Sequence, residues 1–196
     1  MLQMLSDPYQ TCVSMQTPSS TIRALFDAVN RRDWAAAVAL SDPQSLEVWH
    51  QDERAELANV LAPLGTEDPK GTDASVVNDI LLQSATVELR IPGTSLETIG
   101  QIGSLSARDY LVRLWETLDQ MFGRAEPKAP PFEITGETPQ NDGSVRVHYR
   151  GYLGIGGGMP ESLETRRGPD GWRYVVVPDI TVPNFAILAA WRGVSR

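Results

Sequence analysis

The stretch TPSSTIRALFDAVNRRDWAAAVALSDP, residues 17–43, indicates the fold more directly than any other part of the chain. Thr17 followed by Pro18 predicts a helix start, because the hydroxyl accepts from free amide groups and proline suits the first helical turn. Asp33 predicts the cap of a second, shorter helix after a charged corner. The apolar residues of the first helix recur at helical spacing: Ile22, Leu25, Phe26 and Val29. We therefore expect a helical layer with one apolar face.

Two longer helices are expected further along the chain. The first runs from Pro43 to about Ala62 and ends before a loop rich in proline and glycine. The second spans 105–122, where Ser106 and Asp109 resemble a capping box and the apolar residues form a single stripe. Both helices have the length and pattern of elements that pack against a core.

The C-terminal part of the chain is β in character. Alternating patterns predict strands at 132–138, 145–153, 161–167 and 172–177. Turn residues at 141–143 and 169–171 predict hairpins between them, and 184–191 is expected to be a last helix. Helices followed by an antiparallel meander indicate an α+β fold.

Composition limits the classes of function. The formal charge of −8 argues against nucleic acid or an anionic membrane as a partner. No apolar run approaches the roughly 20 residues of a membrane helix, and residues 1–16 lack the pattern of a signal peptide, so a cytoplasmic protein is expected. Cys12 is the single cysteine, which excludes an intramolecular disulfide. Without metal-ligand spacing or a nucleotide-binding motif, we expect no metal and no cofactor.

Together these features resemble the nuclear transport factor 2-like superfamily, cone-shaped α+β proteins that include ketosteroid isomerase, scytalone dehydratase and polyketide cyclases. The resemblance rests on the Thr17-Pro18 start, the corner FDAVNRRDW at 26–34 and the hairpin residues DGWRY at 170–174. It covers about 17–62 and 105–178. It implies N-terminal helices packed on a curved antiparallel sheet, a cavity at the open end of the cone, and frequent homodimers through the sheet.

A single domain of this kind is expected over 17–196, preceded by a loose arm at 1–16. The chain departs from small superfamily members by an insertion at about 63–104. Within the insertion, 76–82 predicts a helical turn, and the alternation over 86–91 predicts a strand.

His50 is the candidate for acid–base chemistry in the helical part. Glu53 lies one turn further along the predicted helix, where its carboxylate can orient the imidazole of a general base. The alternative is a helix face on which both side chains point to solvent. Because no third side chain that could work with His50 and Glu53 is evident, we expect no catalytic residue. His50 stays the candidate general base if the protein is an enzyme after all.

An aromatic pocket inside the cone is the second candidate site. The residues expected to line it are Phe26, Trp49, Tyr110, Leu114, Tyr149, Trp172 and Tyr174. An aromatic lining with a few hydroxyl groups suits a small apolar ligand. The alternative is an ordinary closed core, in which the tyrosine hydroxyls still need partners.

The strand at 145–153 also predicts a surface for a partner. Alternation places Arg146, His148 and Arg150 on one face of the strand, and the valines with Tyr149 on the other. If the valines face the core, the three basic side chains lie on the outer face of the sheet. This arrangement favours a dimer or partner surface there over an active-site base.

From sequence we therefore expect a non-catalytic domain that binds a small apolar ligand or acts as a dimeric interaction module. The alternative is a small acid–base enzyme of the isomerase, dehydratase or polyketide-cyclase kind. Such an enzyme would act on a hydrophobic carbonyl substrate and use His50 or a pocket tyrosine.

Overall fold

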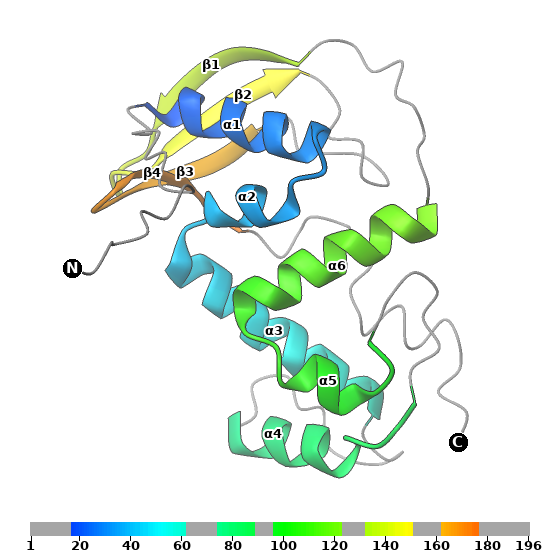
Figure 1. Ribbon diagram of the computed structural model, residues 1–196. Coiled ribbons are helices and arrows are strands. Elements are labelled where there is room, and N and C mark those ends of the chain that lie inside the picture. Colours follow the sequence, from blue (N-terminus) through cyan, green and yellow to red (C-terminus); the bar gives the residue numbers. More distant parts are fainter. Residues whose placement is uncertain (1–16, 62–73, 89–95, 123–131, 151–161, 177–196) are drawn as a thin grey trace, which may run out of the picture.

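The computed structural model describes residues 17–61, 74–88, 96–122, 132–150 and 162–176, which form six helices and four strands (Figure 1). The helices are α1 (Pro18–Asn30), α2 (Trp34–Ala39), α3 (Pro43–Leu61), α4 (Ala74–Gln83), α5 (Ile99–Gly103) and α6 (Ala107–Phe122). The strands are β1 (Glu133–Pro139), β2 (Val145–Arg150), β3 (Ser162–Gly168) and β4 (Gly171–Tyr174). They form an antiparallel sheet in the order β1-β2-β3-β4. The predicted α+β class is confirmed.

Side-chain caps fix the starts of the N-terminal helices. The Thr17 hydroxyl accepts from the Ser20 amide at 3.1 Å, and the Ser20 side chain completes a capping box for α1. The Asp42 carboxylate accepts from the Ser45 amide at 2.8 Å and starts α3 in the same way. These local bonds explain why the predicted helix starts agree with the structure.

The corner between α1 and α2 is closed by backbone hydrogen bonds. The Arg32 amide donates to the Val29 carbonyl and the Asp33 amide to the Ala28 carbonyl, both at 2.9 Å, which is the Schellman arrangement. Arg32 has a φ of 59°, in the left-handed region where glycine is usual. The Asp33 carboxylate then accepts from the Ala36 amide at 3.0 Å and starts α2, as predicted.

The sheet buries one face against α1. The buried side chains of that face are Val147, Tyr149, Leu163, Thr165 and Tyr174. A β-bulge between Ile134 and Gly136 changes the phase of β1, so that Glu137 lies opposite Val147. The Glu137 carboxylate accepts from the Ser19 amide at 3.0 Å and from the Ser19 hydroxyl, which ties β1 to the first turn of α1.

Residues 40–45 attach the start of α3 to the edge of the sheet. The Asp42 amide donates to the Tyr174 carbonyl at 2.7 Å, and the Tyr174 amide donates to the Leu40 carbonyl at 3.0 Å. The Val176 amide donates to the Ser45 hydroxyl at 3.0 Å. From this anchor α3 runs away from the sheet.

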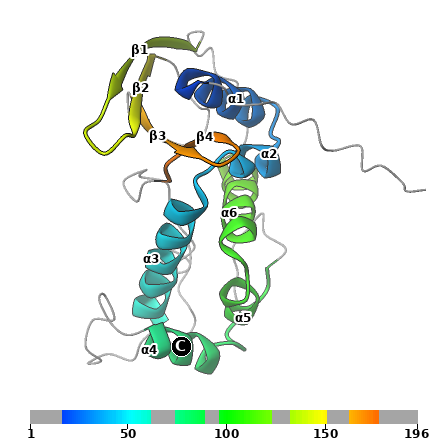
Figure 2. The ribbon, with the colours of Figure 1, turned by 90° about the vertical axis from the view of Figure 1, so that its left-hand side faces the viewer.

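The longer helices form a second part of the fold. Figure 2 shows α3 and α6 side by side and extending from the sheet, with α4 and α5 at their far end. The described strands form an open sheet, and α1 is the helix that lies along it. The cone implied by the superfamily resemblance therefore remains a hypothesis. None of the described helices combines the length and apolar character needed to cross a bilayer.

The described residues between 63 and 104, where an insertion was expected, contain two helices in place of one helical turn. The prediction at 76–82 corresponds to α4, whereas α5 was not foreseen. The strand predicted over 86–91 is wrong in its described part, where Glu88 forms one isolated bridge with Thr98 and residues 84–86 form a turn. Three backbone hydrogen bonds, donated by the amides of Val87, Ile99 and Gly100, stabilise this turn and join it to the start of α5.

Several predictions fall outside the described residues. They are the loose arm at 1–16, the end of the strand predicted at 145–153, and the last helix at 184–191.

Candidate functional site

One face of α3 carries Trp49, His50 and Glu53 into the interior. Only 5% of the His50 surface and 8% of the Glu53 surface are exposed. The alternative in which both side chains point to solvent is therefore wrong. The reason is tertiary, because α6 and α4 both pack against α3 and cover a surface that a lone helix would expose.

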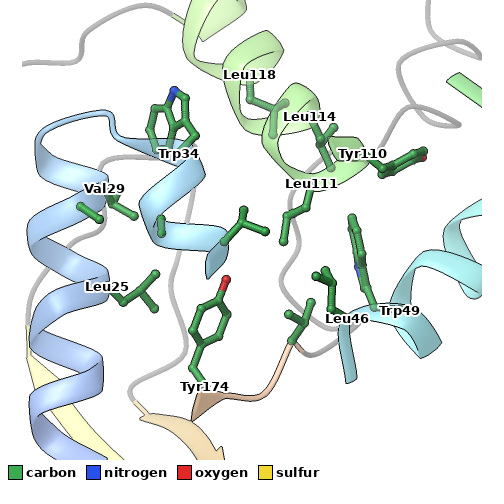
Figure 3. Close-up of a cluster of buried hydrophobic side chains, with 14 of the residues drawn as sticks. Leu25, Val29, Trp34, Leu46, Trp49, Tyr110, Leu111, Leu114, Leu118 and Tyr174 are labelled. Carbon is green, nitrogen blue, oxygen red and sulfur yellow. The ribbon is translucent and has the colours of Figure 1, made fainter. Parts of the chain in front are cut away.

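Tyr110 of α6 meets this face of α3. Its ring centroid lies 5.0 Å from that of His50 and 5.6 Å from that of Trp49, and the Trp49 contact is edge-to-face. Figure 3 shows the Trp49 and Tyr110 rings next to each other, with Leu114 one turn further along α6. Three of the predicted pocket residues thus lie together with the predicted acid–base candidate. We call Trp49, His50, Glu53 and Tyr110 the α3–α6 cluster.

The imidazole of His50 is buried without its full set of partners. Its Nε2 atom makes no hydrogen bond with any described residue. Burial lowers the pKa of His50, the Arg54 guanidinium lowers it further, and the Glu47 carboxylate acts in the opposite direction. The imidazole is therefore mainly neutral at pH 7.

Tyr110 is fully buried and keeps its proton. Burial raises the pKa of Tyr110 well above its usual value, and the carboxylates of Glu53 and Glu56 raise it further. Arg54 opposes this effect, but its guanidinium is directed to other partners: it donates to the Gly103 carbonyl and, at 2.6 Å, to the Asn78 side chain. Arg54 thus links α3 to α4 and α5.

A separate aromatic group lies between α1 and the sheet. Phe26 stacks on Phe132 with 3.7 Å between centroids, and Tyr149 contacts both rings at 5.0 Å and 5.7 Å. Direct stacking leaves no room for a ligand between Phe26 and Phe132. Burial raises the pKa of Tyr149 to about 12, and its hydroxyl has no hydrogen-bond partner among the described residues.

The two remaining pocket candidates lie on β4. The Tyr174 hydroxyl points toward α2 in Figure 3, and burial raises the pKa of this phenol. Trp172 is half-buried, and its carbonyl accepts from the Thr21 hydroxyl at 3.1 Å. The seven residues expected to line one pocket are thus distributed over at least two sets of contacts.

The outer face of β2 has the predicted alternation. Arg146 and Arg150 are exposed and His148 is half-buried, whereas Val147 and Tyr149 are buried. The His148 Nε2 lies 2.9 Å from the Thr138 hydroxyl. The placement of Arg146, His148 and Arg150 away from α1 is therefore confirmed.

Carboxylates accompany the arginines on this outer face. Glu133 lies opposite Arg150 in the sheet register, and Glu164 lies opposite Arg146. Glu164 also pairs with Arg166 at 3.0 Å. The face therefore carries mixed charge, which contributes little net stability at exposed positions.

Sequence reasoning missed three contributors to these sites. Phe132 begins the β half and gave no signal of its ring contacts. The Glu137–Ser19 bond joins positions 118 residues apart, which no local pattern reports. α5 had a detectable signal, because Thr98 and Gln101 form a capping box.

Comparison with known proteins gives no relative for the chain. No protein-family model, curated protein or solved structure matches it. The described residues contain no group of three or more histidine, cysteine, aspartate or glutamate side chains placed to hold a metal ion. The function is therefore inferred from the geometry of the site.

Proposed function

We propose that this chain is a non-catalytic domain that binds a small, largely apolar molecule at the α3–α6 cluster. The observation that carries the proposal is the buried Nε2 atom of His50, which makes no hydrogen bond with any described residue. A buried polar atom without a hydrogen-bond partner lowers the free energy of unfolding by about 1–3 kcal/mol. A ligand that supplied the missing hydrogen bond would offset that cost on binding.

The walls of the cluster support the same proposal. Trp49 and Tyr110 supply aromatic surface, and Leu46, Leu57 and Leu114 supply aliphatic surface in the same core. Apolar walls with a few convergent polar groups are typical of small-molecule sites. The neutral imidazole suits a hydrogen bond to such a molecule.

The superfamily resemblance remains part of this proposal. The antiparallel meander, with α1 across one face, supports a relation to the nuclear transport factor 2-like proteins. The α3–α6 cluster would then be a site on the helical side of the fold. A relation of this kind bears on fold and not on the ligand.

A thermal-shift screen against apolar small molecules tests the binding function. A ligand present at 100 times its Kd adds about 2.7 kcal/mol of stability. The gain should be lost in His50→Leu and kept in His148→Leu, which removes the other histidine of the chain. A ligand that stabilises the parent and His50→Leu equally would place the site elsewhere, and no stabilising ligand at all would reject the function.

The alternative function is an acid–base enzyme on a hydrophobic carbonyl substrate. It is favoured by the lowered pKa of His50, which keeps the base unprotonated at neutral pH, and by Glu53 one turn away. Turnover of a carbonyl panel should then fall by at least about 100-fold in His50→Ala. If the parent turns over none of the panel, the enzyme proposal fails while the binding proposal stands.

A dimeric interaction module on the outer sheet face is the third proposal. Its support is the placement of Arg146, His148 and Arg150 on the face away from α1. Arg150→Glu should then change the mass measured by light scattering, because it reverses a charge that this exposed face would present to a partner copy. An unchanged mass, with the fold intact by circular dichroism, would reject a homodimer through the sheet.

A further inference from the structure

We infer that the outer face of the sheet binds an extended acidic segment of another protein through three side chains of β2. These side chains, Arg146, His148 and Arg150, lie on the face away from α1, and we call them the basic row. The inference goes beyond the binding function proposed for the α3–α6 cluster, and it gives this face a different protein as partner in place of a second copy. It follows from the exposure, the spacing and the charges of the row.

The sheet leaves the basic row open to a partner. α1 is the described helix that contacts all four strands, and Figure 2 shows it on one side of the sheet. On the other side, the register neighbours of His148 are the small residues Gly136 and Ser162. A Cβ atom added at Gly136 would have only its chain neighbours within 4 Å. The centre of the outer face is therefore low, and the backbone of a partner can approach it.

The two arginines of the row have no ion-pair partner among the described residues. Arg146 and Arg150 are exposed, and neither guanidinium bonds to a described side chain or carbonyl. The carboxylate opposite Arg146 belongs to Glu164, which pairs with Arg166 at 3.0 Å. Complementary charges on a partner steer its approach and fix its position. Both guanidinium groups are available for that role.

The spacing of the row fits an extended segment. Side chains on one face of a strand follow each other at about 6.7 Å, because every second residue points to that face. The alternate side chains of an extended partner have the same interval. Carboxylates at three alternate positions can therefore meet Arg146, His148 and Arg150 together, and each guanidinium can bind a carboxylate with two hydrogen bonds.

The neighbouring charges favour a protein segment over other acidic partners. Glu133 lies beside Arg150 and Glu164 beside Arg146, so a backbone with a negative charge on every unit would meet repulsion. A protein segment can place neutral residues at those points. A second copy is also disfavoured: in an aligned face-to-face dimer centred on the row, two-fold symmetry sets arginines of one copy against arginines of the other.

Matched peptides test the partner class on the full parent chain. Blocked peptides carry glutamate, glutamine or lysine at alternate positions, with serine between them, and one further peptide has the same glutamates in a single block. In ¹H–¹⁵N spectra at low salt, the alternating glutamate peptide should shift the His148 imidazole signals and leave those of His50 in place. It should bind at least about three-fold more tightly than each of the other peptides, and added salt should weaken it.

Two arginine variants locate the contact. Arg146→Ala and Arg150→Ala should each weaken the alternating glutamate peptide by at least about three-fold. Arg23→Ala, which removes an exposed arginine of α1, is the matched control and should leave the affinity unchanged.

Four outcomes would overturn the inference. Equal binding of the glutamine peptide would remove the acidic partner, and tighter binding of a thymidine oligonucleotide would assign the face to a polyanion. A dimer of the parent, measured by light scattering, that dissociates in Arg150→Glu would assign the face to a second copy. Absence of any His148 shift would leave the row without this role. None of these outcomes affects the ligand site proposed at His50, which the thermal-shift screen tests separately.

Discussion

Arg32, at the corner between α1 and α2, forms an ion pair with Asp119 of α6, with 2.7 Å between the guanidinium nitrogen and the carboxylate oxygen. The arginine holds this position with a left-handed φ of 59°. That conformation costs an L-residue roughly 1–2 kcal/mol, whereas glycine adopts it without strain. The ion pair gives a reason for an arginine at a site where the backbone favours glycine. It also joins the corner to the helical part of the fold, close to the contact of Trp34 with Trp115.

Substitutions at Arg32 should separate backbone strain from the ion pair. Arg32→Ala keeps the strain and loses the pair, so the free energy of unfolding should fall by about 0.5 kcal/mol. Arg32→Gly loses the pair but relieves the strain, so its stability should exceed that of Arg32→Ala by about 1 kcal/mol. Urea unfolding measures both changes. Equal stability of the two variants would contradict a strained corner. A double-mutant cycle of Arg32→Ala with Asp119→Asn measures the interaction energy of the ion pair by itself.

Stability should depend on pH through His50. Because burial lowers the pKa of His50, the unfolded chain binds a proton more readily than the folded chain. The stability that the neutral, buried His50 contributes is therefore complete above the pKa of the unfolded chain, about 6.5. It is lost as the pH falls through the lower pKa that His50 has in the folded chain. Urea unfolding at several pH values should show this loss in the parent and a shallower one in His50→Leu. His148→Leu, which keeps His50, should follow the parent, and identical slopes in all three would contradict the prediction.

The bond from β1 to α1 should contribute measurably to stability. Glu137→Ala removes the acceptor for the Ser19 amide and hydroxyl in the first turn of α1. The expected loss is about 1–2 kcal/mol, the range for a charged group at a helix start. Glu133→Ala, an exposed glutamate on the same strand, is the control and should change stability by less than about 0.5 kcal/mol. Similar losses in both variants would mean that the Ser19 contact contributes nothing specific.

The packing of α5 can be tested with two glycines of the same helix. A Cβ atom at position 100 would lie 2.9 Å from the Ala85 carbonyl oxygen, whereas at position 103 the nearest atom would be the Leu81 Cβ at 3.8 Å. Gly100→Ala should therefore destabilise the fold by about 1–3 kcal/mol. Gly103→Ala meets only ordinary contact and should be neutral within about 0.5 kcal/mol. Thermal unfolding of the pair measures the difference, and equal midpoints would show that α5 does not pack closely on Ala85.

Much of the secondary structure was accessible from local residue chemistry. Thr17 and Asp33 start α1 and α2 because their side chains accept from amides within the same turn. Gly143 and Gly171 close the hairpins with positive φ values, which glycine adopts without strain. The strand predicted at 86–91 is wrong in its described part, 86–88, because alternation over so few residues also fits a turn with one bridge.

The site was only partly accessible, because burial of His50 and Glu53 is a property of helix packing. On an isolated α3 these side chains lie beside the apolar stripe, and the sequence allows them to face solvent. Whether Tyr110 contacts His50 or Tyr149 depends on where α6 packs. No pattern of neighbouring residues in the sequence predicts that position.

By itself, the sequence determined the α+β class, the starts of α1 and α2, both hairpins, and the outward placement of Arg146, His148 and Arg150. Each of these follows from contacts within a few residues or from the alternation of a strand. Only the tertiary structure decided that the predicted pocket residues form no single ring cluster: Trp49 meets Tyr110 between α3 and α6, Phe26 meets Tyr149 between α1 and the sheet, and Trp172 and Tyr174 lie on β4. It also decided that His50 is buried beside Tyr110, because those contacts join helices that are far apart in the chain.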